Sequence, residues 1–169
     1  MPGKKVMLVV PPYKFDSQVY MTLRRAFENA GHKVAVTSVA PDAAFAGKGV
    51  YVPVDVRIHD IKYYEYDLFV FIGGEGAVTY FDNEYVIKLC KDVKYKTVAA
   101  TGNATVILAR AEALKNKRAT GAPQFAGLLI DAGANFTNEG LEVDGDVYTL
   151  KDPILVEQLA TALIKKLNG

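Results

Sequence analysis

The amino-acid sequence predicts an α/β protein in which helices cover both faces of a mostly parallel sheet. Apolar runs of strand length alternate along the chain with segments of helical periodicity, and those runs lack the alternation of half-exposed strands. Near the C-terminus, Asp144 and Gly145 separate two short strand-like segments and predict a β-hairpin, because both residues tolerate positive φ. The 169 residues, half of them hydrophobic, are expected to form one domain, residues 1–169, with a three-layer core.

The first half of the chain predicts a strand at residues 5–10, which a pair of prolines ends because proline cannot donate to a ladder. Asp16 or Ser17 can cap the helix that follows, and Gly31 supplies its C-terminal stop. Further strands are predicted at residues 33–39, 51–56 and 67–72.

The second half continues the same alternation. A helix is predicted at residues 83–93, a strand at 97–101, helices from 103 to 113 and from 124 to 132, and hairpin strands at 136–143 and 147–150. Pro153 suits the first position of a last amphipathic helix, in which Lys165 and Lys166 favour the negative end of the helix dipole.

Charge and composition indicate which partners to expect. Twenty basic residues against nineteen acidic ones give a net charge of +1, without a long run of one sign. We therefore expect a small-molecule or protein partner, no nucleic acid and no membrane. One cysteine excludes an intramolecular disulfide, and the short apolar run near the start is too brief for a signal or a membrane span, so a cytoplasmic location is predicted.

Several segments resemble a known family in their order and spacing. Residues 71–74 form a strand that ends in a glycine pair, residues 98–120 form an elbow, helix and basic turn, and residues 130–134 and 143–146 match its C-terminal part. Over essentially its whole length the chain resembles the ThiJ/PfpI superfamily, the intracellular protease-like group with a flavodoxin-like sandwich and the class I glutamine amidotransferase-like fold. The resemblance implies a homodimer or larger homo-oligomer.

The resemblance places the family's elbow cysteine at Gly102 and the neighbouring histidine or small residue at Asn103. Glycine supplies no thiolate, and an amide accepts no proton at neutral pH, so cysteine-dependent protease, deglycase and glyoxalase chemistry is not expected. Reading the elbow one residue earlier would instead make Thr101 the candidate nucleophile. Asp16 is the carboxylate nearest to the position of the family's acid, although residues 13–16 depart from the family pattern.

Backbone groups at the elbow remain chemically useful. The N–H groups of Gly102, Asn103, Ala104 and Thr105 would open a helix and could hold a carboxylate, phosphate or sulfate. Residues 73–76 follow a neighbouring strand, so Gly73, Gly74 and Glu75 should line the same crevice. They are equally explained as a tight turn, and Glu75 is either an acid in the crevice or a solvated turn residue.

The remaining candidate residues favour structural roles. Cys90 lies on the apolar face of its helix and is predicted to be in the core. His32 and His59 lack metal-ligand spacing, so no metal is predicted, and no cofactor is indicated. The tyrosines at 63, 64 and 66 favour an amphipathic surface or subunit contact over a stacking platform for bases, because a basic groove is lacking.

Two functional hypotheses follow. The first is a catalytically degenerate ThiJ/PfpI-like protein, or pseudoenzyme, that retains a small-molecule or anion-binding crevice at the former nucleophile elbow. The alternative is a hydrolase, glyoxalase or isomerase-type enzyme that uses other residues, such as Asp16, Glu75 and a bound water.

Overall fold

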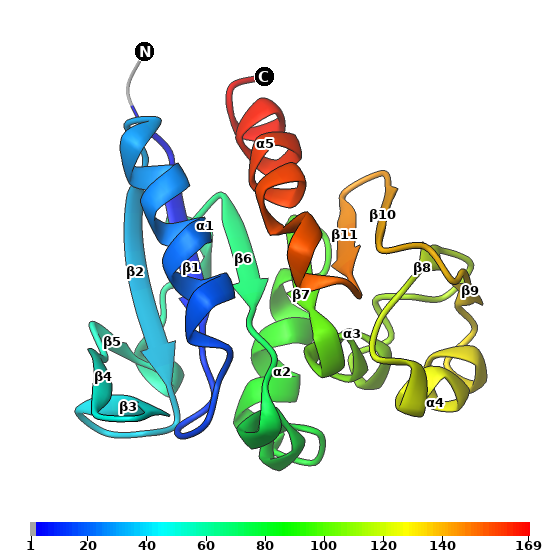
Figure 1. The fold of residues 1–169 in the computed structure, drawn as a ribbon, viewed down its shortest axis with the longest axis horizontal. Helices are drawn as coiled ribbons and strands as arrows, with labels where there is room; N and C mark the ends of the chain where they lie inside the picture. Colours follow the sequence, from blue (N-terminus) through cyan, green and yellow to red (C-terminus); the bar gives the residue numbers. More distant parts are fainter. Residues whose placement is uncertain (1–2) are drawn as a thin grey trace.

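The computed structural model describes residues 3–169 and contains a seven-stranded central sheet (Figure 1). The strand order is β10-β11-β7-β6-β1-β2-β5, and every pair is parallel except the β10–β11 hairpin. Its strands are β1 (Lys5–Val9), β2 (Lys33–Ser38), β5 (Val56–Arg57), β6 (Leu68–Phe71), β7 (Thr97–Thr101), β10 (Leu141–Asp144) and β11 (Val147–Leu150). The predicted α/β class, with a parallel sheet and a C-terminal hairpin, is confirmed.

Five α-helices and two small sheets complete the described chain. The helices are α1 (Ser17–Asn29), α2 (Glu84–Val93), α3 (Thr105–Arg110), α4 (Ala126–Asp131) and α5 (Val156–Leu167). The small sheets pair β3 (Ala43–Gly47) with β4 (Val50–Pro53), and β8 (Arg118–Ala119) with β9 (Asn135–Phe136). Short 3-10 helices span Ile58–Asp60, Tyr63–Glu65, Glu75–Tyr80, Gly102–Ala104, Pro123–Phe125 and Pro153–Leu155.

Two apolar layers lie on opposite faces of the sheet. Alternate residues of β1 separate cleanly, because Val6 and Leu8 pack with α1 and α5 whereas Met7 packs with α2 and α3. The strands are therefore buried on both sides, which explains why their sequences are apolar at almost every position. Within residues 3–169, no helix combines the length and the apolar character that crossing a membrane requires.

Several predicted boundaries are wrong. The predicted strand 51–56 is divided between β4 and β5, and the predicted strand 136–143 begins at Leu141. The predicted helix 103–113 opens as a 3-10 turn and its α-helical part ends at Arg110, since Glu112 has a φ of +62°. The predicted helix 124–132 likewise opens as a 3-10 turn before α4.

The hairpin loop lies one residue later than predicted. Asp144 pairs with Val147 and still belongs to the ladder, so the two loop residues are Gly145 and Asp146. Only Gly145 of these has positive φ, +62°, which is the requirement of a type II′ turn.

Candidate functional site

The candidate site lies where β1, β6 and β7 end. These strands are adjacent and parallel, so the loops that follow them meet at one edge of the sheet, the lower edge in Figure 1. A backbone hydrogen bond joins the first two loops, since the Asp16 N–H donates to the Gly73 carbonyl at 2.8 Å. The crevices of parallel α/β sheets form at this edge.

Gly102 follows the last residue of β7 and has a φ of +56°, in the left-handed region. A side chain is strained in that conformation, whereas glycine adopts it freely. A Cβ atom at this position would meet no atom within 4 Å, so open space lies directly above the elbow. The structure confirms a strand-to-helix turn at residue 102 in a conformation suited to glycine.

Asn103 joins the elbow to the turn after β6. Its Oδ1 accepts a hydrogen bond from the Gly74 N–H at 3.1 Å, and its Nδ2 donates to the Gly74 carbonyl at 2.9 Å. The side-chain amide therefore forms hydrogen bonds with both the N–H and the C=O of Gly74, as the backbone of a neighbouring strand would. This pairing needs one donor and one acceptor on the same side chain, which asparagine provides.

Thr101 has a similar structural contact. Its hydroxyl oxygen accepts a hydrogen bond from the Gly73 N–H at 3.0 Å, and the residue is buried. Gly73 is equally constrained, because a Cβ there would collide with the carbonyl oxygen of Thr101. The alternative nucleophile at Thr101 thus lies beneath the turn, pointing at a backbone amide.

The two candidate acids have separate partners. The Asp16 carboxylate caps α1, accepting a hydrogen bond from the Val19 N–H at 3.2 Å. The Glu75 side chain is 81% exposed and lies 3.6 Å from the Lys14 ammonium. Glu75 is thus exposed to solvent in the turn after β6.

A third segment, residues 119–122, lies against the elbow from the other side. The Ala122 N–H donates to the Gly102 carbonyl at 3.2 Å, and Gly121 leaves room for the Thr105 hydroxyl, with which a Cβ would collide. Thr105 in turn donates from its hydroxyl to the Gly102 carbonyl at 3.0 Å. Gly102 therefore uses its carbonyl to hold both the start of α3 and this segment.

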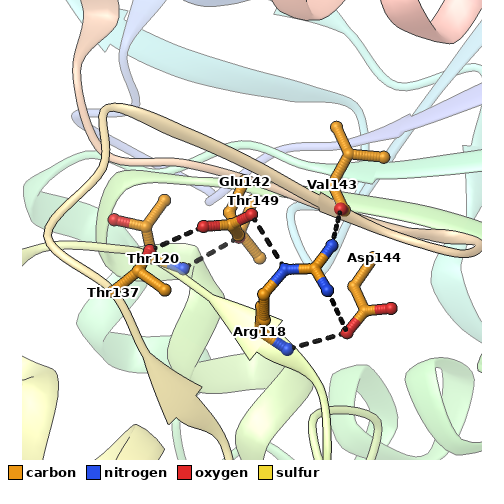
Figure 2. A network of polar contacts seen from close by, with 7 residues as sticks. All are labelled: Arg118, Thr120, Thr137, Glu142, Val143, Asp144 and Thr149. Carbon is orange, nitrogen blue, oxygen red and sulfur yellow. Dashed lines mark hydrogen bonds and ion pairs between the residues drawn. The ribbon is translucent and has the colours of Figure 1, made fainter.

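Arg118 anchors that segment to the C-terminal hairpin (Figure 2). Its guanidinium donates to the Val143 carbonyl at 2.8 Å and to Glu142 at 3.3 Å, while its backbone N–H donates to the Asp144 carboxylate at 2.9 Å. No local sequence pattern indicates this network, because its members are 24 to 26 residues apart.

Cys90 is fully buried on the inner face of α2, as predicted. Burial raises the pKa of its thiol well above the ordinary value, and nearby Lys94 lowers it only in part. A thiol held in its protonated form is a poor nucleophile. Cys90 is therefore no substitute for a side chain at Gly102.

Tyr80, at the end of the 3-10 helix that follows Gly74, was not identified from the sequence. Its hydroxyl donates to the Val10 carbonyl at 2.6 Å and accepts from the Val39 N–H at 3.0 Å, so it joins the ends of β1 and β2. Burial raises its pKa to about 12, against smaller opposing effects of its hydrogen bonds with Ser38 and Val39. These contacts give Tyr80 a structural role at the ends of the two strands.

The histidines lie apart from the elbow. His59 is in the short helix after β5, 3.8 Å from Asp60, and the Nδ1 atom of His32 accepts from the Lys4 N–H at 3.0 Å. In the described part of the chain, no three histidine, cysteine or acidic side chains gather in a way that could hold a metal ion.

The fold and the site together define a broad class, the α/β proteins that have a mostly parallel sheet and a strand-to-helix elbow at a central strand. The model of the DJ-1/PfpI family matches residues 4–166, and the chain belongs to that family. An uncharacterized protein of Methanocaldococcus jannaschii is 33% identical over 99% of this chain and 84% of its own. A Pyrococcus abyssi protein named a deglycase is 24% identical, covering 87% of this chain and 90% of its own.

The solved structures agree with this assignment. The ThiJ/PfpI domain protein from Brachyspira murdochii superposes with a TM-score of 0.93 at 26% identity, covering 99% of this chain and 98% of its own.

Proposed function

We propose that this protein is a DJ-1/PfpI-family member without cysteine chemistry at the elbow, and that it uses the open elbow to bind a small anionic ligand. The observation that carries the proposal is Gly102, which has no side chain at the position where the family resemblance places the nucleophile. Peptidase, glyoxalase and deglycase reactions of the cysteine-dependent kind need a thiolate there. Names such as deglycase therefore describe relatives and not this chain.

Ligand binding is supported by the space above Gly102 and by the short helix that begins there. Backbone N–H groups at the start of a helix favour negative charge, and no Cβ at residue 102 blocks their approach. Cavities of about 100 to 480 Å³ elsewhere on the molecule are lined by other residues. The proposed ligand is consequently small, such as a phosphate, sulfate or carboxylate group.

The alternative enzyme would use Asp16 and Glu75 as acid and base. The Asp16 carboxylate already caps α1, and Glu75 is exposed and paired with Lys14. Both carboxylates are therefore engaged by groups of the protein itself, whereas a general acid or base must reach the proton that it transfers. We therefore retain the non-catalytic proposal.

The catalytic half of the proposal is tested by assaying wild-type protein for peptidase activity and for turnover of methylglyoxal. We expect no cysteine-dependent activity, and Cys90→Ala should leave any measured activity unchanged. The double variant Gly102→Cys/Asn103→His, made in the Cys90→Ala background, should react with iodoacetamide much faster than Cys90 does in native wild-type protein. Wild-type glyoxalase turnover that disappears in Cys90→Ala would refute the proposal.

The binding half is tested separately by titrating inorganic phosphate while following backbone amide resonances. We expect saturable shifts at residues 102–105, with residues 84–87 at the start of α2 as an internal control. Equal shifts at both helix starts, or none at the elbow, would contradict ligand binding there and leave the catalytic result unaffected.

A further inference from the structure

A second surface lies at the opposite edge of the sheet, where the parallel strands begin. Lysines that are distant in sequence gather there, because each parallel strand enters the sheet from the same side. Lys5 is paired in register with Lys33, and Lys96 directly precedes β7, two strands away from β1. We name this surface the amino edge and define it by Lys4, Lys5, Lys33, Lys62, Lys94 and Lys96 with Tyr63, Tyr64, Tyr66 and Tyr95.

Positive charge predominates at the amino edge. Its six lysines are interrupted by two carboxylates, Glu65 and Asp67, and Asp67 accepts a hydrogen bond from the Lys5 N–H at 2.9 Å. Acids on the flanking elements have their own cations, since Asp92 pairs with Lys88 at 3.0 Å and Asp146 with Lys166 at 2.9 Å. The whole chain carries a formal charge of only +1, so the rest of the molecule is net negative.

Tyr63, Tyr64 and Tyr95 are exposed beside these lysines, whereas Tyr66 is half-buried against Phe69. Tyr95 is 84% exposed and Tyr64 is 67% exposed, although such large rings are normally at least partly covered. The Lys94 ammonium lies 5.4 Å from the centre of the Tyr95 ring, and the Lys5 ammonium lies 5.9 Å from that of Tyr66. Exposed rings interleaved with ammonium groups suit stacked bases on a phosphate backbone.

The dimensions suit an extended ligand. The strands from β2 through β1 and β6 to β7 are consecutive in the sheet, and neighbouring strands are about 4.8 Å apart. The amino edge therefore spans about 14 Å, which exceeds the length of one small anion.

From these observations we propose that the amino edge binds single-stranded nucleic acid without sequence preference, the lysines contacting phosphates and Tyr64 and Tyr95 stacking on bases. The absence of a basic run in the sequence led us to expect no such partner. That expectation was based on the order of charges along the sequence, whereas the parallel topology brings lysines that are distant in the sequence to one edge of the sheet.

The test is fluorescence anisotropy of the full chain with a labelled 12-nucleotide oligothymidylate at 20 to 300 mM salt. We expect saturable binding that weakens as salt rises. The variant Lys5→Gln/Lys62→Gln/Lys96→Gln should bind at least tenfold more weakly at 50 mM salt. It should also lower the slope of log affinity against log salt by about 2, since each phosphate contact contributes about 0.7 for single strands.

A matched control removes the same charge from the opposite edge. Lys14→Gln/Lys48→Gln/Lys151→Gln should bind within twofold of wild type. For the rings, Tyr64→Ser/Tyr95→Ser should weaken binding at least fivefold, whereas the equally exposed Tyr51→Ser on β4 should not. Thermal unfolding of each variant checks that these surface changes leave the fold intact.

The proposal is overturned if wild-type protein fails to bind at 20 mM salt, or if the two lysine variants lose affinity equally. It is also overturned if a polyglutamate peptide competes as well as the oligonucleotide, because an acidic protein segment would then be the better partner. None of these results bears on the elbow, which lies at the other edge of the sheet.

Discussion

At the scale of single residues, Gly102 and Gly73 are required for different reasons. Gly102 has open space around it but a backbone conformation that disfavours other residues. Gly73 has no such conformation, but the Thr101 carbonyl leaves no room for a Cβ. The elbow therefore combines one conformational and one steric requirement within two adjacent turns.

The conformational requirement predicts opposite effects at two equally open glycines. Gly102→Ala should lower the free energy of unfolding by about 1–2 kcal/mol, the cost of a left-handed alanine. Gly127→Ala should raise it by about 0.5–1 kcal/mol, because Gly127 lies within α4 with no atom near its missing Cβ. Urea denaturation measures both, and a neutral or stabilising Gly102→Ala would contradict the assigned backbone geometry.

At the scale of elements, the amide of Asn103 joins the turn after β6 to the start of α3. Asn103→Ala should lower the free energy of unfolding by about 1–3 kcal/mol, since two hydrogen bonds are lost and the Gly74 N–H loses its acceptor, although the Gly74 carbonyl still accepts from the Ala77 N–H. Hydrogen exchange at residues 73–75 should become faster. Asn138→Ala is the control, because its side chain contacts only the exposed Lys151 ammonium and should change stability by less than about 0.5 kcal/mol.

The elements also show how much could be predicted from the sequence. The strands β1, β6 and β7 and the elbow glycine were identified because apolar runs and glycines are local signals. The helix after the elbow was predicted too long, because the alanine-rich residues 109–113 fit a helix. No local sequence signal indicates that Glu112 adopts the left-handed conformation. The pairing of Asn103 with Gly74 spans 29 residues, and the position of the hairpin loop depends on the register of β10 with β11; neither is encoded in a short pattern.

At the scale of the whole molecule, burial of the Cys90 thiol in the apolar layer around α2 makes the stability of the fold depend on pH. Burial raises its pKa in the folded state, whereas an unfolded chain ionises near the ordinary thiol value of about 8.5. Because its pKa is raised, the thiol in the folded state keeps its proton to higher pH than the thiol in the unfolded chain. Its contribution to stability is therefore complete below pH 8.5 and is lost as pH rises above that value.

We therefore expect the free energy of unfolding to fall above pH 8.5, approaching about 1.4 kcal/mol per pH unit from this one group. Cys90→Ala should remove that dependence between pH 8.5 and 9.5, whatever its stability at pH 7. The free energy of unfolding of both proteins should fall above pH 10. Tyrosines in the unfolded chain ionise there, whereas Tyr80 in the folded state has a pKa of about 12. If the free energy of unfolding had the same slope against pH in both proteins between pH 8.5 and 9.5, the burial of the thiol would be contradicted.

The Arg118 network has a consequence for self-association. β10 is the outermost strand of the sheet, and an outer strand offers unpaired backbone groups to other chains. Arg118 occupies the Val143 carbonyl of that strand and places a cation beside it (Figure 2). Removing the side chain with Arg118→Ala should thus promote strand-to-strand aggregation, measured as faster growth of light scattering below the unfolding temperature, so that this arginine protects the folded protein from polymerisation.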